Sequence, residues 1–207
     1  MTHAFMNKLP LPVLALSAVA LLGLAGCATK TAYVDPASSR TITEVGRINI
    51  QDFASAADTM VKSLITDIVS QDKLKSAAPA EPALMAISRI QNNTGQQLDT
   101  DQLVKKIRVE LLRTGKVQTS TTMNLGGAAD PLAVQQQAAQ EFLEDKKHTR
   151  LPDYTLSGKI IQDQARAGNV RQSSFIFQLS LSSRAGVAVW EDEKIITKQG
   201  KQPNVGF

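Results

Sequence analysis

The sequence is poor in the residues that most often carry chemistry. It has one cysteine and two histidines among 207 residues, and aromatic residues make up 4%. One cysteine excludes a disulfide within the chain. His3 and His148 alone are a poor supply of metal ligands or catalytic bases. So few aromatic side chains argue against a platform on which bases or sugars stack.

No charge of one sign dominates the chain either. It has 23 basic and 19 acidic residues, a formal charge of +4, which is too weak to predict a nucleic-acid partner. Hydrophobic content of 43% and charged content of 20% are typical of a globular protein. The length suits one domain of ordinary size with a tail.

Motifs of known catalytic sites are missing as well. There is no G-x-S-x-G nucleophile elbow, and Gly126-Gly127 lacks the spaced glycines and lysine of a phosphate-binding loop. His148 follows two lysines, which indicates a surface residue at a helix end. Residues Glu191–Glu193 follow one another on a predicted strand, so adjacent carboxylates point to opposite faces and read as exposed charge. We predict no catalytic site and no cofactor.

The N-terminus accounts for the single cysteine. Lys8 precedes the apolar run Leu11–Leu24, which has the length of a signal peptide core and is short for a membrane span of about 20 residues. The run ends in Leu24-Ala25-Gly26-Cys27. Small residues directly before a thiol resemble the lipobox of bacterial lipoproteins. Translation from Met6 would still leave Asn7 and Lys8 before the run.

That resemblance implies that residues 1–26 are a signal peptide and that Cys27 is lipidated. The thiol takes a diacylglyceryl group, the signal is removed, and the new amine is acylated, which gives more than the one chain needed for stable anchoring. Ala28 stands where aspartate tends to retain such lipoproteins in the inner membrane, so it indicates the outer membrane. The alternative for Cys27 is a buried core thiol.

Downstream of Cys27 the chain is predicted to be a tether up to residue 49, followed by a globular domain over residues 50–207. Residues 28–42 are polar and small, and about fifteen such residues span roughly 20 Å as a flexible coil. Spacing and turn residues predict the elements of the domain. Three helices are predicted: one over 54–70 capped by Asp52 or Ser55, one from Asp99-Thr100 to Gly115, and one from Asp130-Pro131 to about Lys147. Strands are predicted over 83–90, over 116–122, and near 154–160, 175–181 and 187–195. A connector over 76–82 precedes the first strand, and a turn over 91–95 follows it.

This order predicts an α+β fold, a sheet covered by helices on at least one face. The second helix is predicted to bury Leu103, Val104, Ile107, Leu111 and Leu112. Its basic residues, Lys105, Lys106, Arg108 and Arg113, fit a solvated helix face, and a binding patch is the alternative. Trp190 fits a core anchor, with a partner-binding hot spot as the alternative.

Three segments then show a family resemblance: residues 83–94, 107–117 and 152–160, followed by Phe177–Leu181, a glycine turn and Val189-Trp190-Glu191. Their order resembles the LpoB-type penicillin-binding protein activators, outer-membrane lipoproteins of Gram-negative bacteria. The resemblance implies a mixed β-sheet flanked by helices, similar to the N-terminal domain of TolB.

The resemblance also implies a function without chemistry of its own. Such lipoproteins bind a bifunctional class A penicillin-binding protein and stimulate its synthesis of peptidoglycan by favouring its competent state. No partner-binding residue can be transferred by motif, so the binding surface stays unknown. The tether is short for the family, with a reach on the order of 20–50 Å. The alternative is a structural or assembly lipoprotein that scaffolds another envelope complex, because fold does not fix function.

Overall fold

The computed structural model describes residues 31–36, 38–121, 131–142 and 150–201. The predicted signal peptide, Cys27, Asp130 and His148 lie outside the described residues. Contacts divide the chain into two units, residues 1–35 and 36–207, and the fold described here is that of the second unit. Among the described residues, no helix is both long and apolar enough to cross a membrane.

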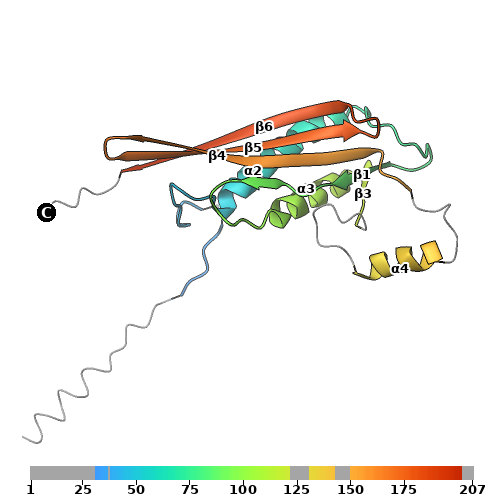
Figure 1. Cartoon of the computed structure of the whole chain (residues 1–207), viewed down its shortest axis with the longest axis horizontal. Coiled ribbons are helices and arrows are strands. Elements are labelled where there is room, and N and C mark those ends of the chain that lie inside the picture. Colours follow the sequence, from blue (N-terminus) through green and yellow to red (C-terminus); the bar gives the residue numbers. More distant parts are fainter. Residues whose placement is uncertain (1–30, 37, 122–130, 143–149, 202–207) are drawn as a thin grey trace, which may run out of the picture. The chain divides into compact units, whose positions relative to one another are not determined.

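The second unit is built on a six-stranded mixed sheet (Figure 1). The spatial order is β3-β1-β4-β5-β6, and β2 also pairs with β4. The pairs β1–β3, β1–β4 and β2–β4 are parallel, whereas the pairs β4–β5 and β5–β6 are antiparallel. This confirms the mixed sheet, while similarity to TolB stays a prediction. The strands are β1 Ala83–Ile87, β2 Gln91–Asn93, β3 Val117–Thr119, β4 Tyr154–Ala167, β5 Val170–Ser183 and β6 Ala188–Lys201.

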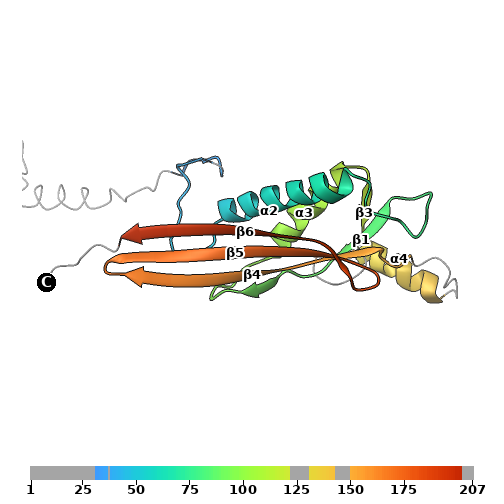
Figure 2. The same ribbon diagram turned by 90° about the horizontal axis from the view of Figure 1, so that it is seen from above.

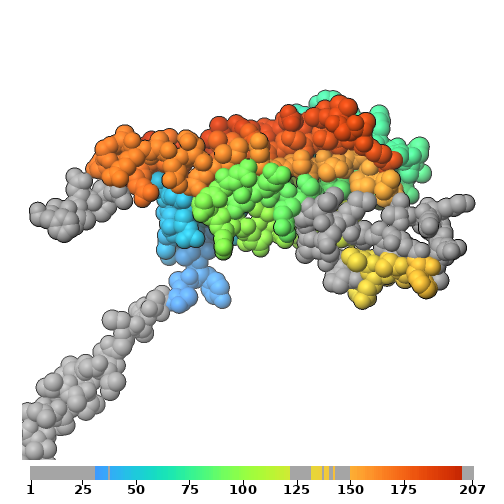
Figure 3. Space-filling model, viewed as in Figure 1, coloured from blue at the N-terminus to red at the C-terminus, as the bar shows by residue number. Residues whose placement is uncertain are grey.

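Two helices cover one face of this sheet. Figure 2 shows α2 (Ile50–Leu64) and α3 (Asp101–Arg113) on the same side of the strands, and the space-filling view in Figure 3 shows α3 packed closely beneath them. A single cluster of buried apolar side chains fills the space between the two layers. Trp190, at the start of β6, is 8% exposed and belongs to this cluster, which confirms its prediction as a core residue.

The first helix begins four residues earlier than predicted. The carboxylate of Asp52 accepts a hydrogen bond from the backbone N–H of Asn49 at 2.7 Å, so Asn49 caps the helix and Asp52 lies within its first turn. The predicted caps, Asp52 and Ser55, were therefore wrong. At its other end α2 continues as a π-helix, η1 (Ile65–Val69), and ends one residue before the predicted position.

The second helix agrees with its prediction in position. Thr100 precedes it, and Gly115 follows it with φ +66°, a left-handed conformation that favours glycine after a helix. Leu103, Val104, Ile107 and Leu111 are buried as predicted. Leu112 is 46% exposed instead, because it is turned by about 100° from Leu111 around the helix.

The strands differ from their predictions in length, and β1 and β3 are shorter than the predicted spans 83–90 and 116–122. The predicted turn at 91–95 begins with a short strand, β2, because the chain stays alongside β4 after β1: the N–H of Ser88 donates to Leu156 O at 2.8 Å, and Ile90 is buried. Strands β4, β5 and β6 also run longer than predicted, since their far ends pair with one another without an apolar alternation.

The last helix, α4 (Pro131–Phe142), contains the predicted start, and its predicted end at Lys147 lies outside the described residues.

Packing against the sheet begins before residue 50. Ile48 is buried, and its N–H donates to Gln96 Oε1 at 3.1 Å. Lys198 on β6 donates to Asn49 Oδ1 and to Asp52 Oδ2, both at 2.6 Å. The last residues of the predicted tether are thus held on the far ends of β4 and β6.

Gly158 on β4 is required by close packing. A Cβ atom there would lie 2.6 Å from Leu179 Cδ2 and 2.6 Å from the Gln178 carbonyl oxygen. Both neighbours belong to β5, and Leu179 is fully buried. The sheet therefore has no room for a side chain at this position.

We expect Gly158→Ala to lower the free energy of unfolding by about 1–3 kcal/mol, because the added methyl group must displace buried backbone or Leu179. Urea unfolding followed by circular dichroism measures the change. Gly46→Ala is the matched control, since nothing lies within 4 Å of its Cβ position. Equal stability of the two variants would contradict the packing described here.

Candidate functional site

Helices α2 and α3 leave the other face of the sheet uncovered, and this face presents side chains in rows across the strands. The register places Ser157, Ser180 and Glu191 in one row. The next row holds Lys159, Gln178 and Glu193. Alternate residues of a strand point to the same face, so both rows lie on one surface. We call this surface, between β2 and β6, the open face.

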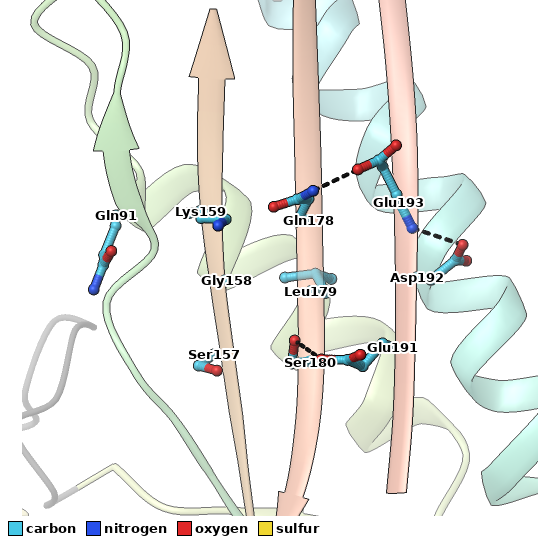
Figure 4. A pocket seen from close by; sticks show the side chains of 10 residues that line it. All are labelled: Gln91, Ser157, Gly158, Lys159, Gln178, Leu179, Ser180, Glu191, Asp192 and Glu193. Atoms are coloured by element: carbon cyan, nitrogen blue, oxygen red, sulfur yellow. Dashed lines mark hydrogen bonds between the residues drawn. The ribbon is translucent and has the colours of Figure 1, made fainter. Parts of the chain in front are cut away.

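A hollow of about 640 Å³ lies over these two rows. Figure 4 shows its lining side chains in front of the sheet, with α2 and α3 behind it. Gln91 of β2 borders the hollow on one side, and Glu191 and Glu193 of β6 border it on the other. The site therefore crosses four strands, the consecutive strands β4, β5 and β6 and the distant strand β2.

Both glutamates in the hollow are held by neutral donors. Gln178 Nε2 donates to Glu193 Oε2 at 2.5 Å, and Ser180 Oγ donates to Glu191 Oε1 at 2.8 Å. Within the described residues neither carboxylate forms an ion pair. Hydrogen bonds from neutral groups orient a carboxylate but leave its charge in place. Lys159 is exposed two strands away, about 10 Å across the sheet.

An apolar row adjoins the charged row. The register aligns Ile161, Ile176 and Ile195 on the open face, and Ile195 is 54% exposed. Isoleucine at an exposed position of a sheet gains little from folding alone. An apolar strip with a charged border is the usual composition of a protein-binding surface.

The chemistry of the open face suits recognition. Ser180 donates to a carboxylate, and Glu191 and Glu193 lie about 7 Å apart along one strand. In the part of the chain that the structure describes, no group of three His, Cys, Asp or Glu residues is placed to hold a metal ion. The polar groups that line the hollow are carboxylates, amides, hydroxyls and the ammonium group of Lys159.

The structure separates the three acidic residues singled out in the sequence. Glu191 and Glu193 share the open face and are exposed, whereas Asp192 points to the helix side, as the alternation predicted. Sequence reasoning missed Lys159, Gln178 and Ser180 as parts of one site. Their polar alternation within the predicted strands was the available signal.

The basic residues of the second helix mostly form local surface contacts. Lys106 pairs with Asp58 of α2 at 2.9 Å, and Arg113 pairs with Glu110 at 2.7 Å. Lys105 is exposed. These contacts favour the solvated helix face over the alternative of a binding patch.

A second polar cluster is buried and serves the fold. The Asp153 side chain is 4% exposed and accepts from the N–H groups of Ala77 and Leu84 at 3.1 and 2.9 Å. Arg150 and Arg184 also donate to it, at 2.7 and 3.2 Å. Burial raises the pKa of this carboxyl, but the hydrogen bonds from Leu84 and Ala77 and the charge of Arg150 outweigh it, so the pKa lies below its ordinary value of 3.8. With all its partners supplied by the chain, Asp153 is not free to bind a ligand.

Sequence comparison identifies a family. The sequence model of the family described as peptidoglycan-synthase activator LpoB matches residues 52–196, more than two thirds of the chain. No curated protein sequence matches.

Several solved structures are similar to the chain. The LpoB C-terminal domain from Escherichia coli is 14% identical, with a TM-score of 0.39, and the match covers 70% of this chain and 98% of that one. The NMR structure of E. coli LpoB is 14% identical with the same TM-score, covering 97% and 90%. Lipoprotein GNA1162 from Neisseria meningitidis is 12% identical with a TM-score of 0.35, covering 60% and 88%.

We expect Asp153→Asn to lower the free energy of unfolding at pH 7 by about 2–4 kcal/mol, because it leaves two guanidinium groups without their shared carboxylate. The pKa of the Asp153 carboxyl is lower in the folded than in the unfolded protein. Its contribution to the free energy of unfolding is therefore complete above about pH 4 and is lost as the pH falls through the folded pKa. The variant should lack this acid-dependent part. Urea unfolding between pH 7 and pH 2 measures both effects, and the same acid dependence in both proteins would contradict the assignment.

Proposed function

Because the chain belongs to the LpoB family of peptidoglycan-synthase activators, we propose that it is a non-enzymatic outer-membrane lipoprotein that binds and stimulates a bifunctional class A penicillin-binding protein. The observation that carries this proposal is the family match over residues 52–196. The lipobox at Cys27, which lies outside the described residues, supports the anchor. Ala28 supports the outer membrane as its location.

The open face is the surface that we propose for docking. The opposite face of the sheet is covered by α2 and α3, so it is not available to a partner. Glu191 and Glu193 form no ion pair among the described residues, and the isoleucine row lies beside them. The complementary surface on the synthase would present cations next to an apolar strip. Such pairing steers association and fixes register.

Stimulation needs no chemistry from this chain. A partner that binds the competent state of a synthase more tightly than its resting state shifts the population towards the competent state. A differential affinity of about 1–3 kcal/mol is typical of such coupling and changes the equilibrium between the two states roughly 5- to 150-fold. The open face therefore has to discriminate between two states of the synthase.

The length of chain between the proposed anchor and the sheet limits where the two proteins meet. Val45 already packs against Gly200 of β6, so at most eighteen residues, Cys27 to Glu44, separate the proposed anchor from the sheet. Eighteen residues extend to at most about 60 Å and span roughly 25 Å as a coil. The docking region of the synthase must then stand out from the inner membrane towards the anchor.

We expect the native chain to bind the periplasmic part of a class A synthase and to raise its rate of glycan polymerisation. Glu191→Lys/Glu193→Lys should weaken binding at least tenfold, because two cations would then face the cations expected on the partner. Surface plasmon resonance and a polymerisation assay measure the two effects. Asp58→Lys/Asp67→Lys is the control, with the same change of charge on exposed positions of the helix layer.

Two outcomes would count against parts of this proposal. If the native chain neither binds nor stimulates any class A synthase of its own cell, the activator function is wrong, and co-purification with an outer-membrane assembly would favour the scaffold alternative. If the native chain stimulates and the Glu191/Glu193 variant does so equally, the docking face is wrong while the activator function stands.

We expect the mature chain to begin at Cys27 with acyl groups on its thiol and amine. Cys27→Ser removes the thiol and should leave the precursor unprocessed and without lipid. Mass spectrometry of the N-terminal peptide distinguishes the two forms. Thr29→Ser, two residues away, is a control that should be processed normally. An unmodified Cys27 thiol in the native protein would refute the anchor.

A further inference from the structure

The far ends of the three long strands carry a second distinctive surface. Figure 2 shows the turn between β4 and β5 extending beyond the start of α2. All residues from Asp163 to Asn169 are exposed. Three exposed cations lie here, and we call them the basic tip: Arg166 and Arg171 on the helix-side face of the sheet and Lys201 on the open face. Asp163 is the one acidic residue on these strand ends.

Two of these cations face each other directly. Arg166 and Arg171 are paired in the register of β4 and β5, so their side chains leave the sheet on the same face. Like charges directly opposite each other destabilise a strand pair. Arg166 Nε donates to Gly168 O at 3.1 Å, and within the described residues no carboxylate forms an ion pair with any of the three cations. The fold gains nothing from this repulsion, which an anionic ligand would relieve.

The chain from Cys27 reaches the domain at this same place. Val45 Cγ2 lies 2.6 Å from the Cβ position of Gly200, and Gly200 is paired with Arg171. Gln162 donates to Gly46 O at 3.2 Å, and Lys198 donates to Arg47 O at 2.5 Å. Gln162 lies four residues before Arg166 on the same strand, so both point to the same face. The tether therefore joins the domain beside the arginine pair.

We propose that the basic tip binds the phosphate groups of anionic phospholipids in the membrane that holds the lipid on Cys27. This inference rests on the proposed anchor and is independent of the synthase. Guanidinium groups bind phosphate oxygens through paired hydrogen bonds, and each cation close to an anionic leaflet adds to the attraction. Because the tether joins the domain next to these cations, the anchor raises their effective concentration at the leaflet.

This contact would orient the domain. Lys201 ends β6, and Glu193 and Glu191 lie eight and ten residues before it, about 25–35 Å back along the strand. With the basic tip on the leaflet, these two carboxylates stand away from the anionic membrane. The open face is then held clear of the lipid surface, where a protein partner has access.

The test uses the full mature chain, lipidated on Cys27 and reconstituted on phosphatidylcholine vesicles with or without phosphatidylglycerol. A polarity-sensitive dye is attached through Asn169→Cys in the β4–β5 turn, where the new thiol is the free one because lipid occupies Cys27. We expect a blue shift and protection from aqueous iodide on vesicles with phosphatidylglycerol only. Both effects should decline with added salt, because screening weakens exposed charges.

Arg166→Gln/Arg171→Gln should lower the fraction of docked tips at least tenfold, since each cation contributes about a fivefold factor near an anionic leaflet. Lys62→Gln/Lys105→Gln is the matched control, because it removes two exposed cations from the helices. It should respond as the native chain does. Thermal unfolding of each variant verifies that the fold is retained.

Flotation separates failure of the anchor from failure of the tip. A chain that floats with both kinds of vesicle and gives the same spectrum on both would overturn the tip proposal and leave the anchor standing. A chain that does not float with phosphatidylcholine vesicles would overturn the anchor, and the tip proposal with it. An equal loss of response in the control would contradict a specific role of Arg166 and Arg171, because net charge alone would then account for the membrane contact. Sedimentation with purified peptidoglycan that depends on Arg166 and Arg171, without any vesicle response, would assign the tip to the cell wall instead.

Discussion

The buried carboxylate of Asp153 is the interaction on which the arrangement of the sheet depends. It lies directly before β4 and accepts from Leu84 of β1 and from Ala77 of the preceding connector. Arg184, in the turn between β5 and β6, donates to it as well. One residue thus joins the parallel and antiparallel halves of the sheet. A buried charge without these partners would be strongly unfavourable, so the native position of Asp153 requires all of these segments to be in place.

Asp153 holds one end of the sheet together, and the two faces of the sheet have different roles. The helix side buries the apolar core and the Lys198–Asp52 pair. The open face carries polar rows and an isoleucine row that lie outside the buried cluster. Function can therefore vary on the open face and at the strand ends without disturbing the core, which is consistent with a protein that acts by binding.

Prediction from the sequence succeeded where a short-range pattern was strong. Helix α3 has an apolar repeat and a terminal Gly115, and the strand predicted near 175–181 lies within β5, where Phe175, Phe177, Leu179 and Leu181 are buried. It failed where long-range contacts decided the outcome. Asn49 caps α2 with support from Lys198, 149 residues away, and Gln91–Asn93 forms a strand because β4 lies beside it. No local signal reports such partners.

The sequence by itself determined the class of the domain, its main elements, the predicted anchor at Cys27 and the family resemblance, because these depend on composition, periodicity and short motifs. Only the tertiary structure decided which residues act together. Strand register brought Lys159, Gln178 and Glu193 into one row and set Arg166 opposite Arg171. A shift of one residue would send each side chain to the other face, and register is set by the packing of the whole sheet rather than by any segment alone.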